Sequence, residues 1–338
     1  SGDASGNAIY MVDAIRGTLL WSAGHSSDTS ANLKLADMTH AIPSNVTTVD
    51  TDNDNFTDRL YVGDLAGQLW RIDITNGNSA SSLATGGVIA SLGAKGVSTP
   101  TNGDITNNRT FFNAPDVAKI LSSDGTGFYY NIAIGSGDRS MPKSNTTTAD
   151  RFYSIRDYNI DSLTQSQFGS LTKIYDSDLT AITGSIEPDN MSTSGWKFLL
   201  SSTEKSLAQS STLNGAVMFT TFIPGSSAIA CQPTTGTSRS YAIKLTTGTK
   251  YFNNLYETFN TTGLPTQISS INATKIVRTD NTSSSSSSSA GSSGSSSSSS
   301  SSNSTGLSTG CLSGVSILNS CVEFGSKIKT YWREVGTN

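Results

Sequence analysis

The sequence predicts an all-β fold, because strand-like runs are frequent along it and helical periodicity is nearly absent. Apolar and aromatic residues occur in short runs that are separated by clusters of Gly, Asn, Asp and Ser. Runs of this length, rich in Tyr, Phe, Val and Ile and bounded by turn residues, are typical of β-strands. Examples of the expected strands are 8–12, 59–62, 69–72, 128–134, 151–155, 216–222 and 240–245.

One pattern recurs along these runs and favours a β-propeller among the all-β architectures. It consists of an aromatic residue, a charged residue three positions later and a Gly seven positions later. The three copies are Tyr10/Asp13/Gly17, Trp70/Asp73/Gly77 and Tyr241/Lys244/Gly248. In each copy a strand leads through a Gly turn into a second strand, such as 19–21 or 251–252. Repeated hairpins are what propeller blades look like in sequence, although hairpins in any β protein share such residues.

Length and composition limit the number of domains and indicate the compartment. The chain has 338 residues, which corresponds to two domains at roughly 150 residues each or to one long β-rich domain. Charged residues make up only 14% of the chain, where about 25% is usual. Ser, Thr, Asn and Gly must therefore supply the polar surface. This composition is typical of an exported bacterial surface protein.

Several function classes are disfavoured by the same composition. The net charge of −4 provides no basic field for nucleic acid, and no stretch approaches the roughly 18 apolar residues of a membrane-spanning helix. His25 and His40 lie in no Ser/His/Asp or HExxH context, so we expect no enzyme. The cysteines lack CxxC spacing; Cys311 and Cys321 could close a disulfide loop, and Cys231 could pair outside the chain or be a buried thiol.

A low-complexity segment divides the chain into three parts. Residues 282–309 consist almost entirely of Ser, with a few Gly, Asn and Thr. Such a segment cannot bury enough apolar surface to offset its ordering entropy, so we expect a flexible insert or linker. We predict propeller blades over 1–281 and C-terminal strands over 310–338 that complete the propeller. Within that last part, strands are expected at 315–318 and 327–332.

The sharpest chemical signal is an acidic loop of nine residues. Carboxylates occupy its positions 1, 3, 5 and 9, and position 7 can offer a backbone carbonyl. This is the ligand spacing of the first nine positions of an EF-hand loop, and hard oxygen ligands select calcium over transition metals. The sequence therefore predicts a Ca²⁺ site. The expected ligands are Asp50, Asp52, Asp54, the carbonyl of Phe56 and Asp58.

Two departures from the EF-hand pattern affect this site. Tyr61 stands where the twelfth-position Glu is expected, so Asp58 must close the site. Asn55 replaces Gly at position 6, which should weaken binding slightly, because Asn is the next most tolerant of a left-handed backbone. The alternative is a solvated acidic turn. Against it, two carboxylates about 4 Å apart repel by roughly 4 kcal/mol at an effective dielectric constant of 20, so the cluster needs a cation to converge.

The loop and its surroundings resemble a known family. The loop and the two segments that follow it are similar to the calcium loop and blade signature of the PilC/PilY proteins, which are type IV pilus-tip and biogenesis factors. The similarity covers most of the chain outside the Ser-rich segment. The matching segments are 50–58, 60–65, 67–73, 134–139, 150–153, 156–157, 240–243 and the ending 331–334.

This resemblance implies a fold, a location and partners. It implies a modified β-propeller with seven blades in the full protein, incomplete in this chain, as the C-terminal domain of a larger exported protein. The expected location is the cell surface, at the pilus tip or outer membrane. The expected partners are minor pilins at the pilus tip, host-cell or abiotic surface receptors, and an N-terminal adhesive domain of the same protein that resembles von Willebrand A domains.

The resemblance also implies how calcium would act. In the family, calcium bound by the acidic loop is thought to oppose pilus retraction, and its release to permit retraction and twitching motility. Two features of this chain depart from the family. There is no Arg-Gly-Asp triplet to support integrin binding through that motif, and the Ser-rich segment is not a family feature.

Two alternative functions use the same features. A quinoprotein-like propeller dehydrogenase would also have aromatic-Asp-Gly repeats and calcium, but such enzymes hold calcium in a central channel beside a quinone and not in a contiguous surface loop. A calcium-dependent glycan-binding adhesin is compatible with the pilus function. A redox absorbance would identify the dehydrogenase, and a glycan array with and without chelator would identify the adhesin.

Overall fold

The structure is a computed structural model that divides the chain into two compact units, Ser1–Ile268 and Ser269–Asn338. In the described residues the only α-helix is α1 (Gln165–Ser170), and nearly all other regular structure is β, as the sequence predicts. The described residues are 3, 5–93, 107–122, 125, 127–143, 147–225, 236–261, 264–265, 269–273, 308–313 and 322–324.

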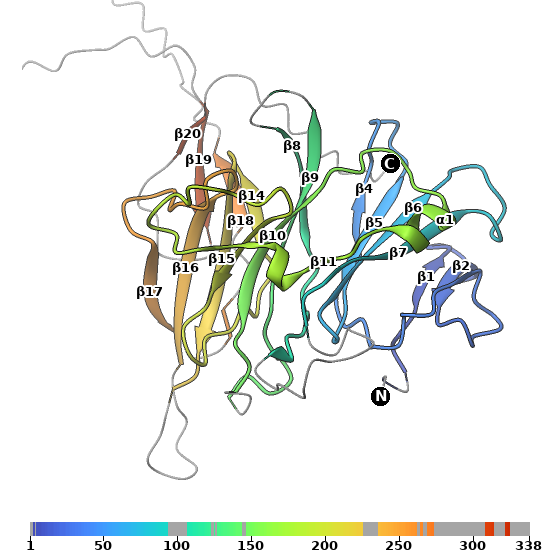
Figure 1. The fold of residues 1–338 in the computed structure, drawn as a ribbon, viewed down its shortest axis with the longest axis horizontal. Coiled ribbons are helices and arrows are strands. Elements are labelled where there is room, and N and C mark those ends of the chain that lie inside the picture. Colours follow the sequence, from blue (N-terminus) through green and yellow to red (C-terminus); the bar gives the residue numbers. More distant parts are fainter. Residues whose placement is uncertain are drawn as a thin grey trace, which may run out of the picture. The chain divides into compact units, whose positions relative to one another are not determined.

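The first unit contains four sheets in its described residues (Figure 1). The first sheet has the order β1 (Ile9–Val12), β2 (Leu19–Gly24), β3 (Leu33–Lys34). The second has the order β11 (Ile174–Tyr175), β7 (Ala84–Ser91), β6 (Gln68–Ile74), β5 (Arg59–Gly63), β4 (Thr47–Val49). The third has the order β12 (Thr180–Ile182), β13 (Gly195–Leu199), β10 (Arg151–Asp157), β9 (Phe128–Gly135), β8 (Asp116–Leu121). The fourth has the order β14 (Ser211–Leu213), β15 (Ala216–Ile223), β16 (Gly236–Lys244), β17 (Tyr256–Thr261).

Consecutive sheets of this unit pack face to face. On β5, Leu60 and Val62 belong to the hydrophobic core shared with the first sheet, whereas Tyr61 belongs to the core shared with the third. On β10, Ile155 joins the core shared with the second sheet and Phe152 the core shared with the fourth. Because side chains alternate between the faces of a strand, a strand covered on both faces is apolar without interruption. This explains the unbroken apolar runs in the sequence.

The recurring hairpin pattern corresponds to real turns. Gly17 and Gly248 have φ angles of 69° and 66°. Each donates its backbone N–H to the carbonyl four residues earlier, on Asp13 at 2.8 Å and on Lys244 at 2.9 Å. The first and third copies therefore form the same turn. The turn is closed by a backbone hydrogen bond, so either Asp13 or Lys244 can stand at its first position.

The prediction of a strand at 251–252 is wrong, because these two residues belong to no strand. There only the N–H of Tyr251 pairs back to β16, donating to the carbonyl of Ala242 at 2.8 Å. The neighbouring N–H of Lys250 donates instead to the carbonyl of Gly184 at 2.6 Å. The backbone is thus held by two different partners, and β17 begins only at Tyr256.

The second unit contains one sheet in its described residues. The strands β18 (Ser269–Ala273), β19 (Ser308–Ser313) and β20 (Val322–Phe324) pair antiparallel in that order. The strands expected at 315–318 and 327–332 lie outside the described residues, as do most of the Ser-rich segment, Cys231 and Cys321. The expectations for them stay predictions.

Candidate metal centre

The acidic loop connects two paired strands of the second sheet. β4 ends at Val49 and β5 begins at Arg59, so residues 50–58 form the whole connection of this hairpin. Val49 and Arg59 are partners in the β4–β5 register, and the N–H of Asp58 donates to the carbonyl of Val49 at 3.0 Å. The hairpin therefore brings together the first and last positions of the loop.

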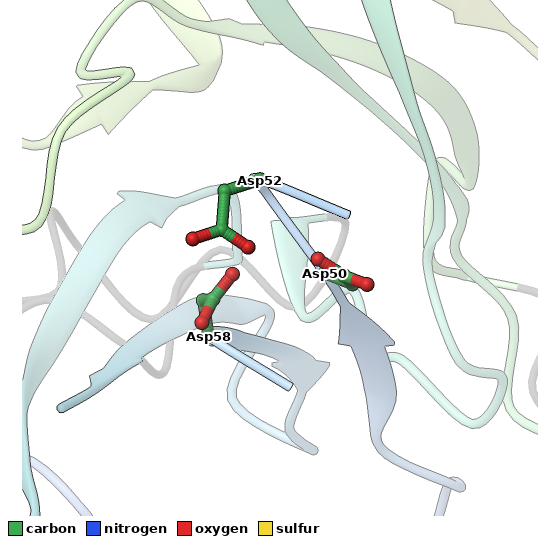
Figure 2. A group of neighbouring side chains, drawn as sticks. All are labelled: Asp50, Asp52 and Asp58. Carbon is green, nitrogen blue, oxygen red and sulfur yellow. The ribbon is translucent and has the colours of Figure 1, made fainter. Parts of the chain in front are cut away.

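Three of the predicted ligands converge. One carboxylate oxygen from each of Asp50, Asp52 and Asp58 lies within 4.8 Å of the others. Figure 2 shows the carboxylates of Asp52 and Asp58 facing each other, with Asp50 beside them. Charges of one sign at such separations repel unless a cation lies between them. The donor set consists only of oxygens, which fits calcium.

The loop backbone is arranged around Asp50. Its carboxylate accepts the N–H of Asn53 at 2.6 Å and that of Asn55 at 2.9 Å. Both asparagines are left-handed, with φ angles of 67° and 73°, as the sequence predicts for Asn55. Partial loss of water acts to raise the pKa of Asp50, but the N–H donors of Asn55 and Asn53 more than offset it, so this pKa lies below its ordinary value. Asp50 is therefore stabilised in its ionised form.

The other predicted ligands differ in their placement. Asp54 lies outside the converging group, and its carboxylate accepts the N–H of Phe56 at 2.8 Å. The Phe56 side chain is 64% exposed. Asp58 accepts the N–H and hydroxyl of Thr51, at 2.7 and 2.8 Å, and the side-chain amide of Asn76 at 3.1 Å. Because a carboxylate has about four lone-pair sites, these hydrogen bonds leave capacity for a cation.

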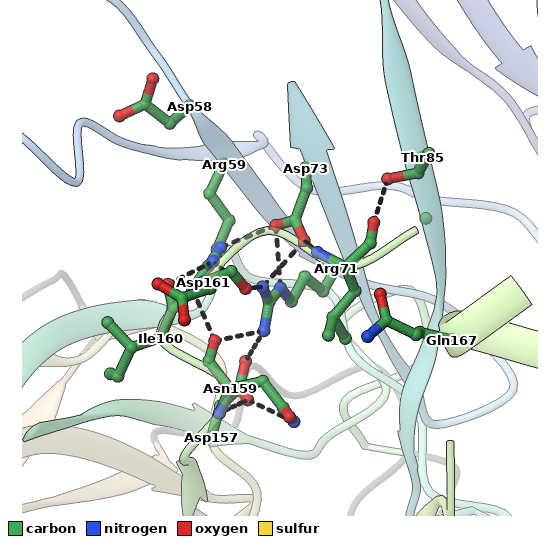
Figure 3. Close-up of polar contacts among 12 residues, drawn as sticks. Asp58, Arg59, Arg71, Asp73, Thr85, Asp157, Asn159, Ile160, Asp161 and Gln167 are labelled. Carbon is green, nitrogen blue, oxygen red and sulfur yellow. Dashed lines mark hydrogen bonds and ion pairs between the residues drawn. The ribbon is translucent and has the colours of Figure 1, made fainter. Parts of the chain in front are cut away.

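A buried ionic cluster that the local sequence patterns do not predict lies directly after the loop. Arg59 pairs with Asp73 at 2.7 Å, and Arg71 pairs with Asp73 at 2.8 Å and with Asp157 at 2.9 Å (Figure 3). All four side chains are at most 5% exposed. Two arginines balance two aspartates, which offsets part of the cost of removing four charges from water.

The same cluster holds a loop of the third sheet against the second. Arg59 donates to the carbonyls of Asn159, Ile160 and Asp161 at 3.2, 2.9 and 3.2 Å. Arg71 donates to the carbonyls of Asn159 and Asp161, both at 2.7 Å. These three residues follow β10. The two arginines of the second sheet therefore supply hydrogen bonds to backbone carbonyls of the segment that leaves the third sheet.

A signal for this cluster is present in the sequence. In a chain with only 14% charged residues, Arg71 and Asp73 lie inside a run that is otherwise apolar, and Arg59 begins another such run. A charge in a strand that is covered on both faces must be paired, because an unpaired buried charge is very costly. From sequence, Asp73 is one position of the hairpin pattern and the last residue of the matching segment 67–73, and neither role predicts a buried ion pair.

The Gly-rich segment 135–139 covers the last residue of β9, Gly135, and the start of the connection to β10. Ser136 donates its hydroxyl to Asp150 at 2.7 Å, and the ammonium of Lys205 lies 4.0 Å from the same carboxylate. Burial raises the pKa of Asp150 to about 6. All three side chains are buried, and the group links the β9–β10 connection to the residues before β14.

Comparisons with known proteins define the fold. No family model and no curated protein matches the chain. The chain is similar to the solved C-terminal domain of PilY1 from Pseudomonas aeruginosa, with a TM-score of 0.53 and 15% identity over 79% of this chain and 63% of that chain. The Dos1 propeller matches with a TM-score of 0.37 and 11% identity, over 78% of this chain and 44% of that one. The PilY1 likeness confirms the predicted β-propeller fold. In the described residues, no helix has the length and apolar character needed to cross a membrane.

Proposed function

We propose that this chain is the calcium-binding propeller domain of an exported type IV pilus-tip adhesin or assembly factor. The observation that carries the proposal is the convergence of Asp50, Asp52 and Asp58 in one hairpin of a PilY1-like propeller. The sequence resemblance to PilC/PilY proteins supports the pilus role. The proposed location is the cell surface, at the pilus tip or outer membrane.

Calcium would act through the strands that hold the loop. Bound calcium neutralises the acidic loop and orders it, which fixes the β5–β6 hairpin in a state that partners recognise. The carbonyl of Asp58 accepts the N–H of Ile74 at 2.7 Å, and Asn76 donates to the carbonyl of Thr57 at 3.4 Å. These hydrogen bonds connect the loop to the end of β6 and the turn after it. Ordering of the loop by calcium would therefore also order that turn.

The proposed partners are those of the pilus tip. They are minor pilins, surface receptors on host cells or abiotic material, and an N-terminal adhesive domain of the same protein. The proposed role is to support pilus biogenesis, attachment and calcium-regulated retraction. Loss of the Asp52 carboxylate in the full-length protein should therefore change how strongly twitching motility depends on external calcium.

Calcium titration of the purified protein tests the metal site. The wild-type chain should bind calcium saturably, and its melting temperature should rise with calcium because the metal binds only the folded state. Asp52→Asn and Asp58→Asn should each raise the calcium dissociation constant about tenfold or more and reduce the rise in melting temperature at a given calcium concentration. Asp189→Asn, which removes an exposed carboxylate outside the loop, should bind calcium as the wild type does. Unchanged calcium affinity in both loop variants would contradict the assignment.

The absorption spectrum separates this proposal from the enzyme alternative. A quinoprotein-like dehydrogenase purified with its cofactor has a redox-sensitive absorbance, because the quinone is conjugated. A spectrum that shows only protein absorbance, before and after addition of a reductant, supports the non-enzymatic function. A redox-sensitive band would favour the dehydrogenase.

A further inference from the structure

The start of the β9–β10 connection packs tightly against Lys205. A Cβ atom on Gly137 would lie 2.9 Å from the Cβ of Lys205, so a larger residue there would displace the lysine. The next residue, Ser206, donates its N–H to the carbonyl of Ser136 at 3.0 Å. Lys205 in turn exchanges two backbone hydrogen bonds with Phe222 of β15, at 2.9 and 2.8 Å. A connection of the third sheet and a strand of the fourth sheet therefore meet at Lys205.

The ammonium of Lys205 and the carboxylate of Asp150 form a poor ion pair. Both side chains are buried, with exposed fractions of 0% and 2%, and Nζ lies 4.0 Å from Oδ2. A hydrogen bond between such charged groups is about 2.7–2.9 Å long, so none is formed between these two atoms. Nζ donates instead to the carbonyl of Thr203 at 3.3 Å. In the part of the chain that the structure describes, Oδ2 of Asp150 has no hydrogen-bond partner.

Burial at this site favours the neutral forms of both groups. Two buried charges that share no hydrogen bond recover little of the free energy that their removal from water costs. Loss of water raises the pKa of Asp150 to about 6, and it lowers the pKa of Lys205 although the charge of Asp150 opposes that shift. Transfer of one proton from the ammonium to the carboxylate gives an amine and a carboxylic acid. A desolvated, neutral lysine amine is a nucleophile, and the carbon of a carboxylic acid is an electrophile.

Ser136 makes the two oxygens of Asp150 different from each other. Its hydroxyl donates to Oδ1 at 2.7 Å and accepts the N–H of Arg151 at 2.9 Å, which fixes the direction of the hydroxyl. A fixed donor on a carbonyl oxygen stabilises the negative charge that develops there when a nucleophile attacks the carbon. Oδ1 is therefore the oxygen that the site holds in place, and Oδ2, beside the lysine, is the oxygen that is free to leave.

We propose that Lys205 and Asp150 become joined by an amide bond between their side chains. The lone pair of Nζ attacks Cγ of the Asp150 carboxylic acid, so the Nζ–Cγ bond forms and the Cγ–Oδ2 bond breaks. One proton moves from Nζ to the departing Oδ2 hydroxyl, which leaves as water. Oδ1 becomes the amide oxygen and keeps the hydrogen bond from Ser136. The step involves no oxidation or reduction and needs no co-reactant.

The fold supplies the two conditions that this condensation needs. It holds the amine and the acid side by side, which makes the step intramolecular, and the flexible lysine side chain can close the remaining gap. It also keeps both groups away from bulk water, which would otherwise hydrolyse the amide. The bond would join the residue before β10 to the residue that pairs with β15, and so link the third and fourth sheets covalently. Neither residue belongs to the acidic loop, so the bond stands or falls independently of calcium binding.

Mass spectrometry of the purified wild-type chain tests the bond. We expect the denatured and reduced protein to be lighter than its sequence by the mass of one water molecule. After digestion with trypsin, we expect a branched peptide that contains both Asp150 and Lys205, with no cleavage after Lys205. A protein that has only its full sequence mass would overturn the proposal, and so would a loss of water that the digest locates at other residues.

Lys173 and Asp37 provide an internal control in the same digest. Their side chains form a closer ion pair, of 2.6 Å, but they are 32% and 54% exposed. Water keeps both of these groups charged, so no amide should form between them although they are nearer to each other. A branched peptide that joins Lys173 to Asp37 would show that proximity alone suffices, and it would contradict the role that we assign to burial.

Two variants test the assigned roles. Lys205→Met has no amine, so its intact mass should equal that of its sequence, and a loss of water in this variant would overturn the bond. Ser136→Ala keeps both reacting groups and loses the donor to Oδ1, so the linked chain should appear about 100-fold more slowly after cell-free synthesis. Linking at the wild-type rate would overturn the role of Ser136. If a variant fails to fold, the wild-type digest still decides whether the bond exists, because it needs no substitution.

Discussion

Arg59 and Asp73 lie directly opposite each other in the β5–β6 register, and their side chains form a buried ion pair of 2.7 Å. Arg59 is also the residue immediately after Asp58, the last residue of the acidic loop. Because successive side chains of a strand point to opposite faces, Asp58 points away from the cluster that Arg59 enters (Figure 3). Asp58, the last residue of the proposed metal loop, is therefore followed directly by a residue, Arg59, that is fixed in the interior.

Replacement of Asp73 should strongly destabilise the protein. Its two carboxylate oxygens accept from Arg59 and Arg71, and both guanidinium groups are buried. Asp73→Asn removes the charge that both arginines share, and loss of one partner of a buried pair costs about 3–5 kcal/mol. Urea denaturation monitored by circular dichroism measures this loss of unfolding free energy.

Asp13 provides the matched control, since it holds the same position in the first copy of the hairpin pattern. Its partner Arg16 has a 77% exposed side chain, and their ion pair is 3.3 Å long. Asp13→Asn should therefore change stability far less than Asp73→Asn. Equal effects of the two substitutions would mean that the buried cluster contributes no more than the turn itself.

The parts of the fold that are predictable from the sequence are those that depend on residues close together along the chain. Strand runs, Gly turns and the two-residue spacing of the acidic loop are all local patterns. The cluster was not predictable in this way, because Arg71 and Asp157 are 86 positions apart in the chain. A charge inside an apolar run indicates that some partner exists, but the partner is known only once the sheets are packed.

The acidic loop shows the same limit on a smaller scale. The spacing predicts that four carboxylates turn inward, and the structure brings three of them together. Asp54 lies between two left-handed residues, Asn53 and Asn55, and its carboxylate accepts the N–H of Phe56. Which carboxylates converge thus depends on backbone angles and local hydrogen bonds that spacing alone does not specify.

Two glycines with similar backbone angles should respond differently to substitution by Ala. Gly67 and Gly77 have φ angles of 76° and 87°, where a side chain costs about 1–2 kcal/mol. A Cβ on Gly67 would lie 2.7 Å from the carbonyl of Arg109 and 2.7 Å from the N–H nitrogen of Gly93, whereas one on Gly77 meets no atom within 4 Å. Gly67→Ala should therefore cost clearly more than Gly77→Ala in urea denaturation. Equal costs would show that the turn conformation alone determines the effect.

Asp64 should make stability decrease as pH rises from about 4 to 7. Burial raises the pKa of its carboxyl from 3.8 to about 7, although Trp70, Gln68 and Ala66 donate hydrogen bonds to it. In this range the folded state holds a proton that the unfolded state has lost. The contribution of Asp64 is thus complete below pH 4 and declines until pH 7, by about 1.4 kcal/mol per unit of pKa difference.

Asp64→Asn tests this pH dependence, because the amide does not titrate. Unfolding free energies of the wild type and the variant, measured at several pH values between 4 and 8, give the slope that Asp64 contributes. The wild-type curve should fall more steeply with pH than that of the variant. Parallel curves would contradict the raised pKa, whatever the absolute stability of Asp64→Asn.

Asp52 and Asp54 provide the sharpest test of the metal site, because they lie in the same loop and are both exposed. Asp52→Asn and Asp54→Asn remove the same charge, so their long-range effects on a bound cation should be similar. Only Asp52 belongs to the converging group, so its loss should raise the calcium dissociation constant about tenfold or more, and that of Asp54 by clearly less. Calcium titration calorimetry measures both constants. Equal weakening would mean that Asp54 turns inward when calcium binds, as the loop spacing predicts.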